Sequence, residues 1–291
     1  VKIGEDEYLA LSQELRKRLD TIRVLQDRGR VDPLAAGLLD EALDGLQVKT
    51  DRAWQEQLQR LTEAQDLVPV VPSTLQAELR DYQVEGFRWL GRLAHWGAGA
   101  CLADDMGLGK TLQAISAASW LVDNAGIRKV LVVCPASLKH QWAREVEKFT
   151  AHSVQIIQGA IENRSVQYRA DVLFFIVNYE LTVRDLVVIS ETLKPDLVIL
   201  DEAQRGTPLE NRLEDLYSLL QVVDARLLGP LWRCLLEFHV TDERGKVIGY
   251  RNLSELRRRI APVMLRRNRS LVSDQLPDRT EVCLDIPLDS M

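Results

Sequence analysis

The sequence has few cysteines and no long apolar run. Its four cysteines are scattered over 291 residues and none forms a C-x-x-C pair, so neither a zinc site nor a disulfide framework is indicated. No run approaches the roughly 18 to 20 apolar residues that are needed to cross a bilayer. The first ten residues, VKIGEDEYLA, lack the basic-then-apolar pattern of a signal peptide. We therefore expect a soluble intracellular protein that does not act on a membrane.

Basic charge is also scarce over most of the chain. The formal net charge is −6, which argues against a protein coated in basic surface, as simple nucleic-acid coating proteins are. The exception is residues 251–269, which contain seven Arg and one Glu. We therefore expect any contact with a polyanion to be local.

The N-terminal part shows a helical pattern. Hydrophobic residues make up 46% of the chain, the usual share for a globular protein with a core. In residues 1–66 they recur at helical spacing, which predicts a small helical region. This region is a candidate contact for a protein partner. Residues 67–74 are rich in Pro and Val and predict a linker.

After residue 79 the pattern changes to short β-branched runs that alternate with amphipathic helices. The predicted helices are 111–124 and 137–149, and the predicted strands are 130–133, 154–157, 172–177 and 197–200. This alternation predicts an α/β fold, a parallel sheet with helices on both faces, over residues 75–225. Ligands of such sheets gather at the carboxyl ends of the strands.

Residues 103–111, ADDMGLGKT, have the features of a phosphate-binding loop between a strand and a helix. The backbone N–H groups around Gly107, Leu108 and Gly109 are expected to approach phosphate oxygens, at the positive end of the helix that follows. Lys110 would reach the β- and γ-phosphates, and Thr111 would place its hydroxyl on Mg²⁺. The strict G-x-x-x-x-G-K-[ST] pattern fails at Asp104. The alternative is a Gly-rich turn that caps a buried helix.

Residues 196–204, DLVILDEAQ, place two carboxylates at the end of a buried strand. Asp201 is expected to hold the metal, partly through water, and Glu202 to orient the attacking water. An acidic pair after a strand also often caps the next helix. The loop upstream favours the nucleotide role.

Six segments together resemble, in order and spacing, the motif set of SNF2-type ATPases of helicase superfamily 2. They are LRDYQVEGFRWL (79–90), DDMGLGKT (104–111), VVCPASLKHQW (132–142), VNYE (177–180), DEAQ (201–204) and GTPLENRLEDLYSLL (206–220). Asp104 is that family's own variant of the loop. The resemblance implies the first RecA-like lobe of a P-loop NTPase that uses ATP and Mg²⁺ to move along double-stranded DNA.

The resemblance also implies roles for residues outside the loop. It implies that Gln83 reads the adenine edge, although the residues alone would make it an ordinary surface side chain. The expected DNA contacts are Pro135, Ser137, Lys139, Asn178 and Tyr179. Trp142 falls on the apolar face of its helix and is expected in the core.

The coupling motif of the family, which links nucleotide state to lobe movement, corresponds to Gly206, Thr207, Pro208 and Asn211. Only three residues, 203–205, separate it from the acidic pair. A parallel crossover needs a dozen or more residues, so we infer that about two dozen residues are missing between 205 and 206.

The last part, residues 226–288, resembles the helical protrusion of the first lobe and the segment that leads to a second lobe. Arg266 and Arg267, with Arg269, are candidate contacts for DNA or for that second lobe; the alternative is a solvated face. The second lobe, with its arginine fingers, lies outside this sequence. This chain is therefore expected to bind ATP and to hydrolyse it poorly.

The leading hypothesis is an ATP-driven translocase on double-stranded DNA that remodels or displaces bound protein. The alternatives are a motor that acts on RNA polymerase or another protein complex, and an ATP-binding regulatory module without productive turnover. Segments such as DERGKVIGY look like prokaryotic members, which predicts a cytoplasmic, nucleoid-associated protein; a eukaryotic member would be nuclear. The sequence indicates no oligomeric state.

Overall fold

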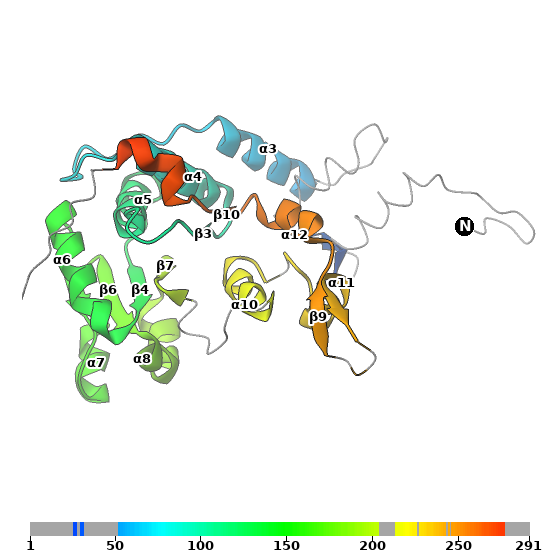
Figure 1. The fold of residues 1–291 in the computed structure, drawn as a ribbon. Coiled ribbons are helices and arrows are strands. Elements are labelled where there is room, and N and C mark those ends of the chain that lie inside the picture. Colours follow the sequence, from blue (N-terminus) through cyan, green and yellow to red (C-terminus); the bar gives the residue numbers. More distant parts are fainter. Residues whose placement is uncertain are drawn as a thin grey trace, which may run out of the picture.

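The structure is a computed structural model that describes residues 26–27, 30–31, 52–203, 213–225, 227–242, 244 and 246–276. Figure 1 shows their arrangement. In chain order the elements are β1 (Gln26–Asp27), β2 (Arg30–Val31), α3 (Arg52–Asp66), α4 (Asp81–Trp96), β3 (Cys101–Leu102), α5 (Lys110–Ala125), β4 (Val130–Cys134), η2 (Ala136–Leu138), α6 (Lys139–Phe149), β5 (Val154–Ile156), α7 (Ile161–Gln167), β6 (Phe174–Asn178), α8 (Tyr179–Arg184), α9 (Leu186–Val188), η3 (Ile189–Leu193), β7 (Leu197–Leu200), α10 (Leu213–Val223), α11 (Leu231–Phe238), β8 (His239–Thr241), β9 (Val247–Tyr250), α12 (Leu253–Ile260), β10 (Met264–Leu265) and η5 (Arg269–Gln275).

A four-stranded parallel sheet in the order β5-β6-β4-β7 forms the centre of the fold. Val130 of β4 lies between Phe174 of β6 and Leu197 of β7, and the register continues residue by residue. Every residue of β4 and β6 is buried, as their near-continuous apolar sequences require for strands covered on both faces. The predicted strands and the predicted α/β class are therefore confirmed, with end shifts of one or two residues.

Helices cover both faces of this sheet because neighbouring residues of a strand point to opposite sides. On one face, Ile115 of α5 and Trp142 of α6 pack against Val132. On the other, Val133 packs with Tyr168, which follows α7, and with Leu193 at the end of η3. The helices predicted at 111–124 and 137–149 correspond to α5 and to η2 with α6.

The strand that leads into the Gly-rich loop lies in a different sheet. β3 pairs in parallel with β10, with Cys101 opposite Met264, so the C-terminal part of the chain returns beside the loop. β7 is the edge of the four-stranded sheet, and its Val198 is 49% exposed. Among the described residues, the strands before the loop and before the acidic pair are thus not neighbours.

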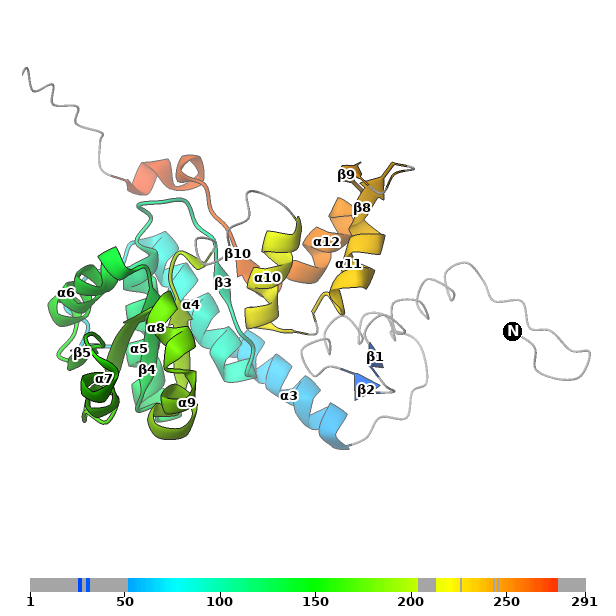
Figure 2. The same ribbon diagram turned by 90° about the horizontal axis from the view of Figure 1, so that it is seen from below.

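The protrusion predicted over residues 226–288 contains strands as well as helices. It contains an antiparallel hairpin, β8 with β9, between α11 and α12. Its core also includes Leu213 and Leu220 of α10, so this core draws on residues from both sides of the predicted boundary at 225. Figure 2 shows α10, α11, α12 and the hairpin grouped to one side of the four-stranded sheet.

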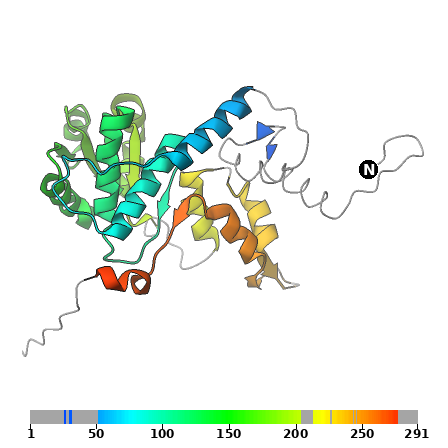
Figure 3. The same ribbon diagram turned by 90° about the horizontal axis from the view of Figure 1, so that it is seen from above.

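The N-terminal part agrees with the predicted helical region over α3, which lies against α4 (Figure 3) through Ala64, Leu93 and Trp96. An antiparallel pair, β1 with β2, was not predicted, and the remaining predicted helices lie outside the described residues. Residues 67–74 run along the surface of α4, where Arg92 Nε donates to the carbonyl of Leu67 at 2.8 Å. Within the described part of the chain, no helix combines the length and apolarity that a membrane span requires.

Candidate nucleotide-binding site

The Gly-rich loop joins β3 to α5 through two left-handed residues. Gly107 has φ of 83° and Gly109 has φ of 71°, a region in which only glycine is unstrained. Gly109 is the N-cap of α5 and no side chain caps this end. The first N–H groups of a helix have no partner within the helix, so those of α5 are available to an anion, with the helix dipole in favour.

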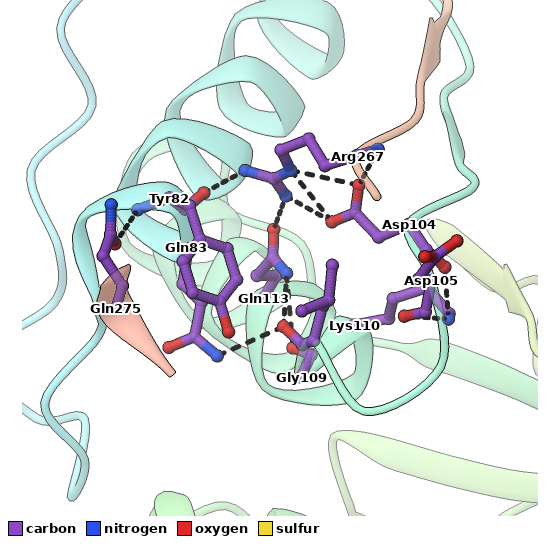
Figure 4. Close-up of polar contacts among 10 residues, drawn as sticks. Tyr82, Gln83, Asp104, Asp105, Gly109, Lys110, Gln113, Arg267 and Gln275 are labelled. Carbon is purple, nitrogen blue, oxygen red and sulfur yellow. Dashed lines mark hydrogen bonds and ion pairs between the residues drawn. The ribbon is translucent and has the colours of Figure 1, made fainter. Parts of the chain in front are cut away.

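Lys110 folds back over the loop. Its Nζ donates to the carbonyl of Asp104 at 2.7 Å and to that of Asp105 at 3.3 Å, so the ammonium lies within the curve of the loop (Figure 4). Thr111 follows in the first turn of α5 and is half-buried. The structure therefore places the predicted phosphate-binding cation at the loop.

Gln83 is buried, which excludes the interpretation of an ordinary surface side chain. Its Oε1 accepts from the N–H of Arg80 at 3.0 Å, and its Nε2 donates to the carbonyl of Leu108 at 3.3 Å. A Cβ at Gly109 would lie 2.4 Å from Gln83 Nε2, so glycine is needed for this approach. In this structure the amide links α4 to the loop, and its adenine contact stays a prediction.

Asp201 lies at the carboxyl end of β7, and α6 and α8 hold it. The indole Nε1 of Trp142 donates to Asp201 Oδ2 at 2.8 Å, and the hydroxyl of Tyr179 donates to the Asp201 carbonyl at 2.8 Å. Burial, with Asp201 nearby, raises the pKa of Tyr179 to about 12, and burial with the same carboxylate raises the pKa of the Cys134 thiol to about 12. Tyr179 and Cys134 therefore remain protonated beside the carboxylate at neutral pH.

Glu202 adopts φ of 51°, which is left-handed backbone for a residue with a Cβ. This conformation costs about 1 to 2 kcal/mol, so the surrounding structure must stabilise it. Strained residues of this kind concentrate at functional sites.

Thr111 and Asp201 carry oxygen donors of the kind that Mg²⁺ prefers. Thr111 offers a hydroxyl and Asp201 a carboxylate, and Mg²⁺ usually takes one or two protein oxygens while it keeps waters and substrate phosphates. No cluster of three or more His, Cys, Asp or Glu side chains suited to a metal is found in the part of the chain that the structure describes. Thr111 and Asp201 would therefore supply part of the coordination of Mg²⁺, and a bound nucleotide and waters would supply the rest.

Three of the predicted DNA contacts, Lys139, Asn178 and Tyr179, have hydrogen-bond partners within the fold. Lys139 is 8% exposed, and its Nζ donates to the Ile157 carbonyl at 3.0 Å and to Asn178 Oδ1 at 3.2 Å. Burial lowers the pKa of Lys139. Asn178 Nδ2 donates to Glu180 Oε2 at 2.5 Å. Lys139 thus joins α6 to the ends of β5 and β6, and Tyr179 joins α8 to the end of β7.

Arg267 also has its partner within the fold. It was predicted to face DNA, the second lobe or solvent, but it is 8% exposed and paired with Asp104, because β10 pairs with β3 and brings it to the loop. Arg266 and Ser137 are exposed and Pro135 is half-buried, so their DNA contacts stay predictions. The coupling residues 206–208 and 211 lie outside the described residues.

Sequence reasoning missed the roles of Trp142 and Gln113 and the pairing of Asp104. Trp142 was correctly predicted to lie in the core, but its N–H bond to Asp201 joins elements 59 residues apart and leaves no local signal. For Gln113 and Asp104 with its partner Arg267, the available signal was Gly86. A glycine in the middle of a helical pattern often marks the close approach of another group, and here Gln113 and Arg267 lie against it.

Comparison with known proteins agrees with this geometry. The SNF2-related domain matches residues 82–205 and 206–291. The chromatin-remodelling ATPase INO80 of Sclerotinia sclerotiorum is 30% identical over 254 residues, and that of Lodderomyces elongisporus is 29% identical over 263. These alignments cover 72% and 75% of this chain but only 15% and 16% of the relatives, so the chain spans less than a fifth of their length.

Solved structures show the same likeness. The Sulfolobus solfataricus SWI2/SNF2 ATPase core in complex with dsDNA is 29% identical, with a TM-score of 0.62, over 72% of this chain and 49% of that chain. The curated relatives named here are fungal, so the comparisons do not support the predicted prokaryotic source. The RecA-like lobe is supported by both fold and sequence, and the family match covers well over half of the sequence. The chain therefore belongs to the SNF2-related domain family.

Proposed function

We propose that this chain is the ATP-binding first lobe of a motor that moves along double-stranded DNA and remodels or displaces bound protein. One observation carries the proposal: the Gly-rich loop places the Lys110 ammonium and the uncapped N-terminus of α5 at one point. This is the arrangement that binds nucleotide phosphates. The membership of the SNF2-related family supports the choice of a DNA motor over other nucleotide-binding proteins.

Each residue of the site has a proposed task. Lys110 and the N–H groups of the loop around Gly107 and Gly109 bind the phosphates. Thr111 and Asp201 hold Mg²⁺, which when bound would neutralise charge on the transferred phosphoryl group. Glu202 orients the attacking water, and Gln83, once released from Leu108, contacts the adenine.

Double-stranded DNA is the proposed track. The relative from Sulfolobus solfataricus is described in complex with dsDNA, and the exposed Ser137 and Arg266 are the described candidates for phosphate contact. Lys139 and Asn178 are both buried and are not part of the proposed DNA contact. They are proposed to stiffen the edge that Pro135 and Ser137 present.

We also propose that a helix and a strand are absent between Arg205 and Gly206, since a crossover of a dozen or more residues is needed there. The family match falls into two segments that meet at this point. The separation of β3 from β7 into two sheets is consistent with a missing strand between them.

Separately from catalysis, we propose that residues 1–66 contact a protein partner. Only α3 and the short β1–β2 pair are described there, and α3 packs on α4 rather than forming a detached region. The curated relatives are fungal chromatin-remodelling ATPases, and a motor that uses chromatin as its track acts in the nucleus, so we propose a nuclear protein.

The test is ATP binding by this chain, followed by hydrolysis with and without duplex DNA. We expect Mg²⁺-dependent ATP binding that Lys110→Ala weakens or abolishes, and slow hydrolysis because arginine fingers are supplied by a second lobe. Glu202→Gln should bind ATP and stall. Absence of ATP binding by the wild type would refute the proposal. Tight binding with no duplex-dependent turnover, even in a chain joined to a second lobe, would favour the regulatory module or a protein activator.

A further inference from the structure

Asp104 is the residue at which the loop departs from the strict P-loop pattern, and it is also the residue that binds the C-terminal segment through Arg267. The side chain of Asp104 is fully buried. Its Oδ1 accepts from the backbone N–H of Arg267 at 2.9 Å and from Nε at 3.0 Å, and its Oδ2 accepts from Nε at 3.1 Å and from a terminal guanidinium nitrogen. A buried carboxylate requires such partners, and these come from 163 residues further along the chain.

The same guanidinium joins the loop to both neighbouring helices. One terminal nitrogen donates to the Tyr82 carbonyl in α4, and the other donates to Gln113 Oε1 in α5 at 2.7 Å. Gln113 in turn donates through Nε2 to the carbonyl of Leu108 at 3.3 Å. Figure 4 shows Arg267 between these groups. A planar fork of five donors is suited to this task, and a lysine is not.

Gly86 makes room for the arrangement. A Cβ at this position would lie 1.9 Å from Gln113 Oε1 and 2.8 Å from a terminal nitrogen of Arg267. Glycine in the interior of a helix destabilises it by about 0.5 to 1 kcal/mol relative to alanine. The cost at Gly86 is explained by the close approach of Arg267 and Gln113 to α4.

The contact extends along the whole loop. The N–H groups of Ala103 and Asp105 donate to the carbonyls of Leu265 and Arg267 at 2.7 and 3.0 Å. Further on, Arg269 N–H donates to Asp105 Oδ2 at 3.1 Å. Val272 then packs in a small cluster with Tyr82 and Leu108, both of which adjoin the site. The backbone at the start of the loop, residues 103–105, is thus held as an extension of β3 beside β10.

We propose that Arg267 is a positioning residue, which sets the phosphate-binding conformation of the loop through Asp104 and Gln113. This rests on the proposed function only in that the loop binds ATP. In a strict P-loop a glycine occupies the position of Asp104 and needs no partner. Here the carboxylate and the guanidinium stabilise one loop conformation together, and either one alone is a buried charge without compensation.

The test is a double-mutant cycle on ATP affinity, measured by calorimetry on the 291-residue chain. Asp104→Gly restores the strict sequence pattern, yet we expect it to weaken ATP binding roughly tenfold or more, because Arg267 is left unpaired in the interior. Arg267→Met should weaken binding similarly. The double variant removes both charges and should bind ATP within about threefold of the wild type, a non-additivity that only coupled residues show.

Controls separate positioning from general destabilisation. Arg257→Met removes the same charge from an exposed side chain of α12 and should leave ATP affinity unchanged. Arg267→Lys keeps the charge but not the fork, so it should bind as weakly as Arg267→Met. Thermal unfolding is followed in parallel, and affinities are compared well below every midpoint, where a merely structural residue would not change the dissociation constant.

The possible results separate the two proposals. If the wild type does not bind ATP, the proposed function fails, and this proposal fails with it. If the wild type binds ATP and both single variants bind equally well, or the double variant is as weak as the sum of the two, then the positioning role is refuted while the function stands.

Discussion

The hydrogen bond between Trp142 and Asp201 predicts that a core residue supports the proposed Mg²⁺ ligand. Trp142→Phe keeps an aromatic ring in the core but removes the N–H that donates to Asp201 Oδ2 at 2.8 Å. The carboxylate then loses the donor that fixes its orientation. We expect weaker Mg²⁺-dependent ATP binding, because outer partners of this kind orient metal ligands.

The magnitude follows from the type of bond. Hydrogen bonds to charged groups contribute about 1.5 to 3 kcal/mol, and about 1.4 kcal/mol corresponds to a factor of ten in affinity. The Mg²⁺ concentration at half-maximal ATP binding should therefore rise by about tenfold to a hundredfold, the range known for outer partners of metal ligands. Removing part of a ring that is 3% exposed should also lower the free energy of unfolding by about 1 to 2 kcal/mol.

The assay is an ATP titration at a series of Mg²⁺ concentrations and in a chelator. Affinity in the chelator should not change, which separates loss of the metal from loss of the loop. Trp96→Phe is the matched control, since Trp96 is 6% exposed and its N–H has no hydrogen-bond partner among the described residues. Trp96→Phe removes the same atoms from a buried ring without breaking a hydrogen bond. An equal Mg²⁺ dependence in wild type and Trp142→Phe, or an equal shift in both variants, would refute the reasoning.

Three further predictions concern stability and packing. Arg164→Met removes the guanidinium that donates to the buried Asp185 carboxylate at 2.6 and 2.7 Å. Chemical denaturation should therefore show a loss of about 3 to 5 kcal/mol in the free energy of unfolding. A loss below about 1 kcal/mol would contradict this. The hydrogen bonds from Arg164 lower the pKa of Asp185 below its usual value of 3.8. The ionised carboxylate therefore contributes fully to the free energy of unfolding above about pH 4, and this contribution is lost as the pH falls further. Asp185→Asn should accordingly flatten the acid limb of the curve of stability against pH. Gly86→Ala should reduce stability by about 1 to 3 kcal/mol through overpacking, whereas Gly249→Ala, where a Cβ meets nothing within 4 Å, should not.

The sheet was predictable because its signal is local. The runs that became β4 and β6 are apolar throughout and long enough to be strands bounded by polar residues, and this pattern depends on no distant contact. The hairpin β8–β9 was missed because its residues are largely exposed and carry little apolar alternation. The pairing of β10 with β3 was not predictable, since two residues of each strand carry no periodicity.

The candidate site likewise has one part that a local sequence signal predicts and another part that depends on distant contacts. The loop around Gly109 and Lys110 was recognisable because phosphate binding needs glycine and lysine at fixed spacing. The internal bonds of Lys139 were not predicted, because a basic residue at a helix start is equally consistent with DNA contact and with an internal bond. Only the tertiary structure shows that Ile157 and Asn178 accept from it.

The pairing of β3 with β10 also determines the order in which the protein is completed. Chains are synthesised from the N-terminus and local contacts form first, whereas contacts between distant residues form slowly. The central sheet draws on strands up to Leu200, but the loop receives its last backbone partners from residues 265 and 267. We therefore expect a nascent chain to form its central sheet before it can bind ATP, and its affinity for nucleotide to appear only when synthesis has passed the protrusion.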